Sequence, residues 1–495
     1  MAGHTRSNDA GQVSKTTTPS RSTFPRASTA AVWTLFVLGL GALALSIRTG
    51  TEWTVEGVVR IDGLTALMWV VVTFFSGIVH SYSRRYMAGD ARIDGFFARV
   101  LAFTLVVMAM TAADHVALFA ATWLAMGLLM AGLIGHERDW AQARAAAGVA
   151  RRHFLASTGL LALGLTVLAW TTGATSITGI LGNLGDVPAS AALVAGGAIF
   201  LAAIVQSALF PFQTWLLSSM TAPTPASALM HAGFVNAGGV LLTRFAPLFA
   251  DRTAAMSVIV AVGAVSALLG QALLLVQTDI KSELGASTLA QMGFMILQCG
   301  LGFFAAAITH LILHGFYKAY LFLSSGATVE QNAPGGHHDD SPDLVGVGVG
   351  LLTALGGGVL FALLTGKGTE LNSGLVLTIV VVLTTLHATR DVLRRSTLPA
   401  TVKLVGTPLI VLVAIGTYAA TFNAITTLLA DVPMTTEPTG LTVVHYAVVA
   451  AFAIAYAATT LGWHRKSRRL YVSLVNLSQP DPDTLLTTKE DYNDA

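Results

Sequence analysis

The segment that decides the fold reads Gln206-Ser-Ala-Leu-Phe-Pro211-Phe-Gln-Thr-Trp-Leu-Leu-Ser-Ser-Met-Thr-Ala-Pro223-Thr-Pro225-Ala-Ser-Ala-Leu-Met-His231. It places three prolines and a histidine inside a strongly apolar part of the chain. Proline removes a backbone donor and clashes with the preceding turn, so it breaks helices. Within a bilayer, broken backbone is tolerated only against protein or a water-filled cavity. Pro211, Pro223 and Pro225 therefore predict a broken helix that lines a cavity, a feature typical of transporters.

The composition of the 495-residue chain is that of a membrane protein. Charged residues make up 11% and hydrophobic residues 54%, whereas a soluble globular chain carries about 25% charge. The charges cluster between apolar runs of roughly 17–23 residues, the length that spans a bilayer as a helix. We therefore expect an all-α polytopic membrane protein in contact with lipid. The net charge of +2 gives no indication of a nucleic-acid partner.

About fourteen membrane-spanning helices are expected. The apolar runs lie near residues 30–48, 60–80, 98–113, 115–135, 154–172, 190–215, 223–245, 256–277, 284–301, 303–326, 345–365, 373–390, 402–421 and 443–463. With the N-terminus in the cytoplasm, most Lys and Arg residues fall in inner loops, as the positive-inside rule requires. The expected outer loops hold only Arg48, Arg60, Arg244, Arg252 and Lys367. An even number of spans with both termini in the cytoplasm follows from this asymmetry.

The domain organisation expected from this pattern is simple. Residues 1–29 are polar and Ser/Thr-rich and lack a signal-peptide cleavage pattern, so they predict a disordered cytoplasmic tail. Residues 30–463 form the membrane domain, and residues 464–495 are expected to be a cytoplasmic C-terminal tail. No segment is long and mixed enough to form a soluble domain.

Several kinds of chemistry are not indicated. The single cysteine, Cys299, rules out an internal disulfide and argues against a cysteine-based metal or iron–sulfur site. No GxxxxGK[ST] motif is present, so energy must come from an ion gradient or a partner rather than from nucleotide. We find no clustered nucleophile and no cofactor loop. The chain by itself is therefore expected to have no cofactor or metal and not to be an enzyme.

The strongest functional candidates recur every four residues in Thr309-His310-Leu-Ile-Leu-His314-Gly-Phe-Tyr-Lys318. On a helix, His310, His314 and Lys318 share one face and are separated by about 6 Å per step. Ionisable residues inside a membrane are costly and indicate function. Histidine titrates near neutrality, and burial lowers the pKa of lysine, so such a row linked by water can relay protons. The alternative is a ladder of packing hydrogen bonds.

Three further ionisable residues are candidates for the same pathway. Lys281 begins an apolar run, where it either serves the pathway or snorkels to the interface. His231 follows the proline-rich break within the next run. Lys367 stands between two runs, where an interfacial loop residue is the alternative.

Two other polar clusters are interpreted as structural. The segment His337-His-Asp-Asp340 suggests a metal site, but consecutive residues point in different directions, so we expect a solvated loop. Asp114-His115 lies between two runs and is expected to form a turn.

These motifs together resemble those of the antiporter-like subunits of respiratory complex I and the Mrp cation/proton antiporters. The resemblance covers about residues 58–390 and is carried by the proline-rich segment, Asp279-Ile-Lys281, Ser287-Thr-Leu-Ala-Gln-Met-Gly-Phe-Met, His310…His314…Lys318, Arg60-Ile-Asp-Gly-Leu64 and His80…Tyr86-Met87. It implies two inverted five-helix repeats, each with a broken helix, and a proton pathway along Lys281, His231, His310, His314, Lys318 and, as a looser match, Lys367.

The sequence departs from the family pattern in the first repeat. The family has a glutamate after a tryptophan, but here Leu124 follows Trp123. The lysine that normally pairs with this glutamate is replaced by Gln206. The absence of both the glutamate and the lysine is physically self-consistent, because neither charge is left buried alone. The working relay is therefore expected in the second repeat.

The short C-terminal tail suggests a subgroup of the family. Complex I's largest antiporter-like subunit adds a long lateral helix, which is not seen after the last apolar run here. This form resembles the membrane subunit of inorganic carbon accumulation complexes of the bacterial inner membrane. The resemblance implies a large, soluble, zinc-dependent partner similar to a β-carbonic anhydrase. It also implies that proton movement through the membrane subunit drives conversion of CO2 to bicarbonate in that partner. A complex I or Mrp-type pump or antiporter, and a non-conducting scaffold, are the alternatives.

Overall fold

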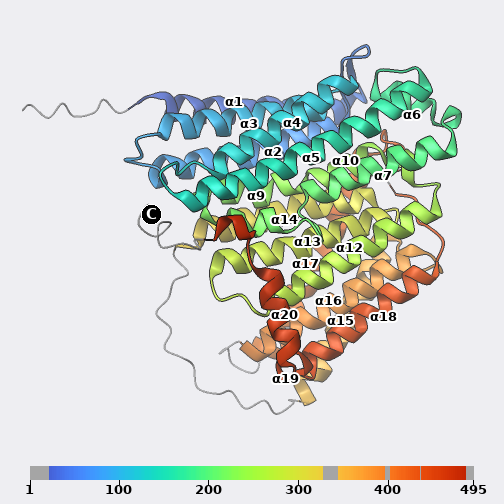
Figure 1. Ribbon diagram of the computed structural model, residues 1–495. Coiled ribbons are helices and arrows are strands. Elements are labelled where there is room, and N and C mark those ends of the chain that lie inside the picture. Colours follow the sequence, from blue (N-terminus) through green and yellow to red (C-terminus); the bar gives the residue numbers. More distant parts are fainter. Residues whose placement is uncertain (1–21, 327–343, 396–401, 435, 486–495) are drawn as a thin grey trace, which may run out of the picture.

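The computed structural model describes residues 22–326, 344–395, 402–434 and 436–485. Long helices run side by side across the molecule, from the blue N-terminal helices on one face to the orange and red helices on the other (Figure 1). The first part of the chain forms α1 (Phe24–Thr49), β1 (Trp53–Val55), β2 (Val59–Ile61), α2 (Gly63–Tyr86), α3 (Ile93–Ala112), α4 (Val116–Ile134), α5 (Ala141–Thr172), α6 (Ile177–Gly182), η1 (Leu184–Asp186), α7 (Ala189–Gln206), α8 (Thr214–Ser218), η2 (Ser219–Thr221), α9 (Thr224–Ala232), η3 (Phe234–Asn236), α10 (Ala237–Arg244) and α11 (Ala246–Phe249).

The second part continues the bundle and ends in a short helix outside it. It forms α12 (Thr253–Leu274), α13 (Ile280–Gly300), α14 (Phe304–Ser324), α15 (Leu344–Thr365), α16 (Ser373–Arg395), η4 (Val402–Gly406), α17 (Thr407–Leu428), α18 (Val443–Thr460), α19 (Trp463–Lys466), α20 (Arg468–Ser478) and η5 (Pro482–Thr484). The two short strands form an antiparallel hairpin in which Trp53 pairs with Ile61.

The expected all-α multi-pass architecture is confirmed. Each of the fourteen apolar runs coincides with a helix or with a helix and its break. Among the described residues, twelve helical segments are long and apolar enough to cross a membrane. Two more helices, α13 and α14, have 21 residues each but are not among the twelve. They carry the polar side chains singled out above, so the count of fourteen and the inverted symmetry of the repeats stay predictions.

Two helix boundaries differ from the expected ones. Helix α1 begins at Phe24, so residues 24–29 are not part of a disordered tail. Pro25 is tolerated there because a first-turn residue has no helical partner for its N–H. Helix α5 begins at Ala141, well before residue 154, because the alanine-rich stretch that follows has high helix propensity. Arg151 and Arg152, expected in a loop, are exposed on this helix instead.

The proline-rich segment breaks the chain as expected. Helix α7 ends at Gln206, and the backbone then passes through Ala208, which has a positive φ of 55°, and a cis bond to Pro211. Helix α9 begins after Pro223, with Pro225 in its first turn. The indole of Trp215 is fully buried and donates to the carbonyl oxygen of Val205 at 2.9 Å, which fixes α8 against α7.

Arg244 is not the outer-loop charge that the sequence suggested. It ends α10 and forms a buried ion pair with Asp62, the N-cap of α2. Burial alone raises the pKa of Asp62, but the charge of Arg244 and its hydrogen bond outweigh this and hold the pKa below its ordinary value. The pair ties α10 to the start of α2, where Thr65 also donates to Asp62 at 2.8 Å.

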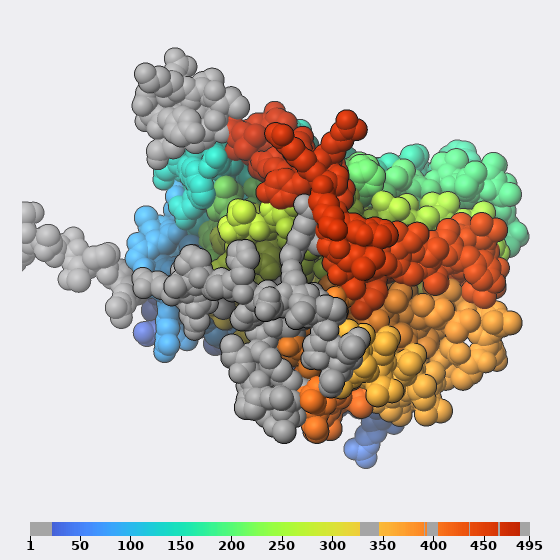
Figure 2. All heavy atoms as spheres, turned by 90° about the horizontal axis from the view of Figure 1, so that it is seen from below, coloured from blue at the N-terminus to red at the C-terminus, as the bar shows by residue number. Residues whose placement is uncertain are grey.

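The C-terminal segment is not a free tail where the structure describes it. Leu474 of α20 is buried against Leu217, Leu273 and Leu289. The backbone N–H of Asp481 donates to Ser218 at 2.9 Å, and Asp483 pairs with Arg152 at 2.7 Å. In Figure 2 this red segment runs over the surface from α18 toward the turquoise α5. We call residues 468–485 the C-terminal strap.

Candidate functional site

The expected row on α14 is buried in the middle of the bundle. His310, His314 and Lys318 are 8%, 5% and 0% exposed. The rings of the two histidines are nearly parallel, with centroids 5.7 Å apart. Lys318 donates to the carbonyl oxygen of Leu284 on α13 at 2.9 Å. A buried ammonium whose described hydrogen bond goes to a single carbonyl is a costly group, so Lys318 stays a candidate for the proton pathway.

His231 joins this row from the broken segment. Its Nδ1 lies 2.9 Å from the hydroxyl of Thr288. Thr288 donates to the carbonyl oxygen of Leu284 at 2.8 Å, the same oxygen that accepts from Lys318. Since the hydroxyl proton is directed at Leu284, the Thr288 oxygen accepts from His231. The imidazole also stacks on Phe322 at 4.4 Å. One backbone carbonyl on α13 therefore connects the lysine on α14 with the histidine on α9.

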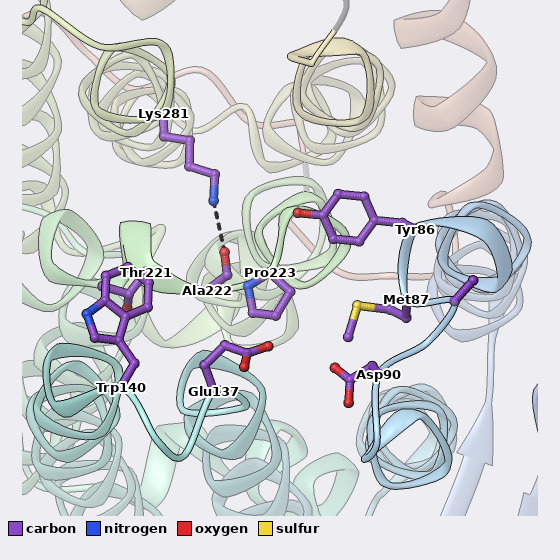
Figure 3. Close-up of a pocket in the computed structure, with 10 residues that line it drawn as sticks. Tyr86, Met87, Asp90, Glu137, Trp140, Thr221, Ala222, Pro223 and Lys281 are labelled. Atoms are coloured by element: carbon purple, nitrogen blue, oxygen red, sulfur yellow. Dashed lines mark hydrogen bonds between the residues drawn. The ribbon is translucent and has the colours of Figure 1, made fainter. Parts of the chain in front are cut away.

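Lys281 stabilises the break itself. Its ammonium donates to the carbonyl oxygens of Met220 and Ala222 at 3.2 and 2.9 Å. These carbonyls lie where the helix is interrupted between α8 and α9, so they lack helical partners. In Figure 3 the side chain extends from α13 toward Ala222. Lys281 is thus neither a free loop charge nor a lipid-facing one.

The structure brings five of the six predicted residues together. His231 lies within electrostatic range of Lys318 and Lys281, and His314 within range of His310, Lys318 and His231. The Nε2 atoms of His231, His310 and His314 are buried and have no hydrogen-bond partner among the described residues. Such atoms are normally satisfied by water. We call Lys281, His231, His310, His314 and Lys318 the buried basic cluster.

Lys367 lies apart from this cluster. It stands between α15 and α16, and its ammonium is 4.8 Å from the centre of the Phe303 ring at the start of α14. His310 follows seven residues later, which places it about 10 Å along the helix axis. Burial lowers the pKa of Lys367, and Glu370 partly opposes the shift. Among the described contacts nothing joins it directly to His310.

Where the family has the ion pair of the first repeat, the described side chains carry no charge. Gln206 is fully buried, and neither atom of its amide has a partner among the described residues. Trp123 donates to Ser157, which donates in turn to the carbonyl of Ala202. Leu124 is partly buried and apolar. The site of the lost ion pair is thus filled by neutral side chains.

The remaining sequence candidates are structural or lie elsewhere. Asp114 accepts from the backbone and hydroxyl of Thr178 at 2.9 and 2.8 Å, so it holds the turn before α4 as expected. The segment His337–Asp340 lies outside the described residues.

Besides the pair Arg244–Asp62, sequence reasoning missed two further polar pairs inside the molecule. Gln298 on α13 donates to Tyr418 on α17 at 2.9 Å, and Asp90 pairs with His136 at 2.9 Å. In both pairs each residue is unremarkable by itself in the sequence. His136, at the end of an apolar run, was the one available signal.

The chain matches models of a known family of membrane proteins. Residues 113–342 match the transmembrane family described as NADH:quinone oxidoreductase/Mrp antiporter, and residues 48–97 match the N-terminus of complex I chain 5. The protein belongs to this antiporter-like membrane family. In solved structures the fold is similar to that of an Mrp complex from Dietzia (TM-score 0.57, 23% identity, 95% of this chain and 53% of that one). It is also similar to the archaeal membrane-bound sulfane sulfur reductase (TM-score 0.59, 14% identity, 93% of both chains).

The relatives found by sequence narrow the class. The chain is 37% identical to the probable inorganic carbon transporter subunit DabB1 of Halothiobacillus neapolitanus, over 57% of this chain and 51% of that protein. It is 37% identical to DabB of Bacillus subtilis over 64% of this chain and 63% of that protein. For DabB of Bacillus anthracis the identity is 36%, over 68% and 66%. The matches thus span about half to two thirds of these relatives' length.

Proposed function

We propose that this chain is the proton-conducting membrane subunit of an inorganic carbon transporter of the bacterial inner membrane. The observation that carries the proposal is the buried basic cluster, in which the carbonyl of Leu284 accepts from Lys318 and from Thr288, the hydrogen-bond partner of His231. Charged histidine and lysine side chains offer donors and no ligand for a sodium ion, so they favour a proton as the moving ion.

The carbon-related part of the proposal rests on the relatives. Proteins named as inorganic carbon transporter subunits are 36–37% identical to this chain. In our proposal a soluble, zinc-dependent partner similar to DabA carries out the hydration of CO2. Proton movement through this subunit drives that reaction toward bicarbonate. The membrane subunit itself contributes no catalytic residue, metal or cofactor, and both of its termini lie in the cytoplasm.

A pump or cation/proton antiporter of the complex I or Mrp type is the second candidate. It is favoured by the 35% identity to NAD(P)H-quinone oxidoreductase chain 5 of Picosynechococcus, over 54% of this chain and 42% of that protein. The replacement of the ion pair of the first repeat by Leu124 and Gln206 weighs against it. This candidate predicts several membrane partners and sodium sensitivity on deletion.

The test is rescue of growth in air of a bacterium that otherwise needs elevated CO2. The chain and its zinc-dependent partner, expressed together, should rescue growth and purify as one complex. Lys318→Ala and His310→Ala should abolish rescue and proton flux in liposomes, because each interrupts the buried basic cluster.

Tyr320→Ala is the matched control, because Tyr320 lies on the same helix but is 71% exposed. It should leave both measurements unchanged. If Lys318→Ala and His310→Ala retain full rescue and flux, the proposed function is wrong.

A further inference from the structure

A cavity of about 340 Å3 opens beside the broken segment. It is lined by the end of α2, the loops that precede α3 and α5, the turn before α9, and Lys281. Figure 3 shows Asp90 and Glu137 on one side and Lys281 on the other. Because one water occupies about 30 Å3 in the liquid, the cavity has room for a connected group of waters. It therefore joins two carboxylates to the first lysine of the buried basic cluster.

The two carboxylates differ in their surroundings. The side chain of Glu137 is 43% exposed, whereas that of Asp90 is 17% exposed and is paired with His136 at 2.9 Å. The imidazole of His136 is fully buried behind Asp90. Burial raises the pKa of Asp90, but the backbone N–H of Arg92 and the hydrogen bond with His136 outweigh it and lower the pKa overall. Asp90 thus remains an acceptor between the cavity and the buried imidazole of His136.

A bound metal ion explains this group less well. One ligand atom from each of Asp90, His136 and Glu137 lies within 4.8 Å of the others. The guanidinium of Arg92, however, is 3.5 Å from Glu137, and its backbone N–H donates to Asp90 at 2.6 Å. A cation already held at the carboxylates opposes a second one.

We propose that Glu137, Asp90 and His136 collect protons at this end of the bundle and deliver them through the water of the cavity to Lys281. A proton captured by a carboxylate passes through Asp90 and His136 to cavity water. Lys281 accepts it after passing its own proton on to the rest of the buried basic cluster. Several charged and titratable groups surround this path: Tyr86 of α2, Arg92 and Arg99 before and on α3, Arg138 and Asp139 before α5, and Asp279 and Lys281 at the start of α13. The inference rests on the proposed proton conduction.

The test is proton flux in liposomes as a function of pH. Asp90→Asn and His136→Gln should conduct nearly as well as the wild type at about pH 6, where bulk protons are plentiful, and severalfold more slowly at about pH 8. Asp139→Asn is the matched control, because Asp139 also pairs with Arg92 but is 97% exposed and does not line the cavity. It should follow the wild-type profile.

Two further measurements separate proton collection from a structural defect. A high concentration of a small mobile buffer should restore the flux of His136→Gln at high pH, since the buffer carries protons into the cavity. Glu137→Gln, at a position that is 43% exposed, should show the same pH-dependent loss. If Asp90→Asn, His136→Gln and Glu137→Gln all show the wild-type dependence of flux on pH while Lys318→Ala is inactive, this inference is wrong and the proposed function stands. If the Lys318→Ala variant still conducts protons, both the proposed function and this inference are wrong.

Discussion

A single hydroxyl connects two parts of the buried basic cluster. Thr288 accepts from His231 and donates to the carbonyl oxygen that also binds Lys318. Removing it leaves a buried imidazole nitrogen without a partner, which costs about 1–3 kcal/mol. The role of Thr288 is therefore one of connection, although its side chain carries no charge.

Thr288→Val should retain the fold and lose most of the proton flux, because valine keeps the shape of threonine but cannot bridge His231 and Leu284. Flux in liposomes and thermal unfolding in detergent measure the two effects separately. The control is Thr309→Val, since Thr309 is equally buried but donates only within its own helix, to Ala305. Equal proton flux in Thr288→Val and Thr309→Val would show that Thr288 does not connect His231 with Lys318.

Gln206 is a buried neutral residue at a position where the family has a charged one. A charged lysine there would be buried without its partner, because Leu124 stands where the family has a glutamate. A neutral amide keeps the cavity-lining break without that penalty. The break after α7 is thus present with a neutral residue at position 206.

At the scale of elements, α12 and α13 pack unusually closely. A methyl group on Gly270 or Gly293 would overlap backbone atoms of Ala290 or Ala267 on the facing helix. Small residues at such positions let helix backbones approach within a membrane. The contact fixes α13, which carries Lys281 and Thr288. Close packing therefore sets the position of Lys281 and of Thr288, the partner of His231.

Gly293→Ala should lower the unfolding temperature and the flux together, because overpacking costs about 1–3 kcal/mol and displaces α13. The same change at Gly197 is the control, since nothing lies within 4 Å of a methyl group there. Alanine favours helix over glycine by about 1 kcal/mol, so Gly197→Ala should be neutral or slightly stabilising. Equal unfolding temperatures for the two variants would show that the interface can yield.

At the scale of the whole molecule, the C-terminal strap joins elements that are far apart in sequence. Leu474 packs on residues of α8, α12 and α13, and Asp483 reaches α5. The strap thus crosses the end of the bundle where Lys281 stabilises the break. Its apolar contact is buried, whereas its ion pair is exposed.

Leu474→Ala should destabilise the protein by about 2–5 kcal/mol, the usual cost of emptying a buried leucine site. Arg152→Gln should cost at most about 1 kcal/mol, because both partners of that pair are 62% exposed. Leu477→Ala is the control on the same helix, at a position that is 41% exposed. Thermal unfolding in detergent measures the stability of the three variants. A larger loss of stability for Arg152→Gln than for Leu474→Ala would show that the ion pair, and not the apolar contact, holds the strap.

The sequence by itself determined the membrane class, the positions of the apolar helices, the proline break and the row His310, His314 and Lys318. These features are local, because hydrophobic run length, proline sterics and four-residue spacing act within one segment. Only the tertiary structure decided that Lys318 bonds to Leu284 and His231 to Thr288, that Arg244 pairs with Asp62, and that Asp90 pairs with His136. Each of these contacts joins residues 34 to 182 positions apart. Which helices become neighbours depends on packing across the whole bundle, and no single segment encodes it.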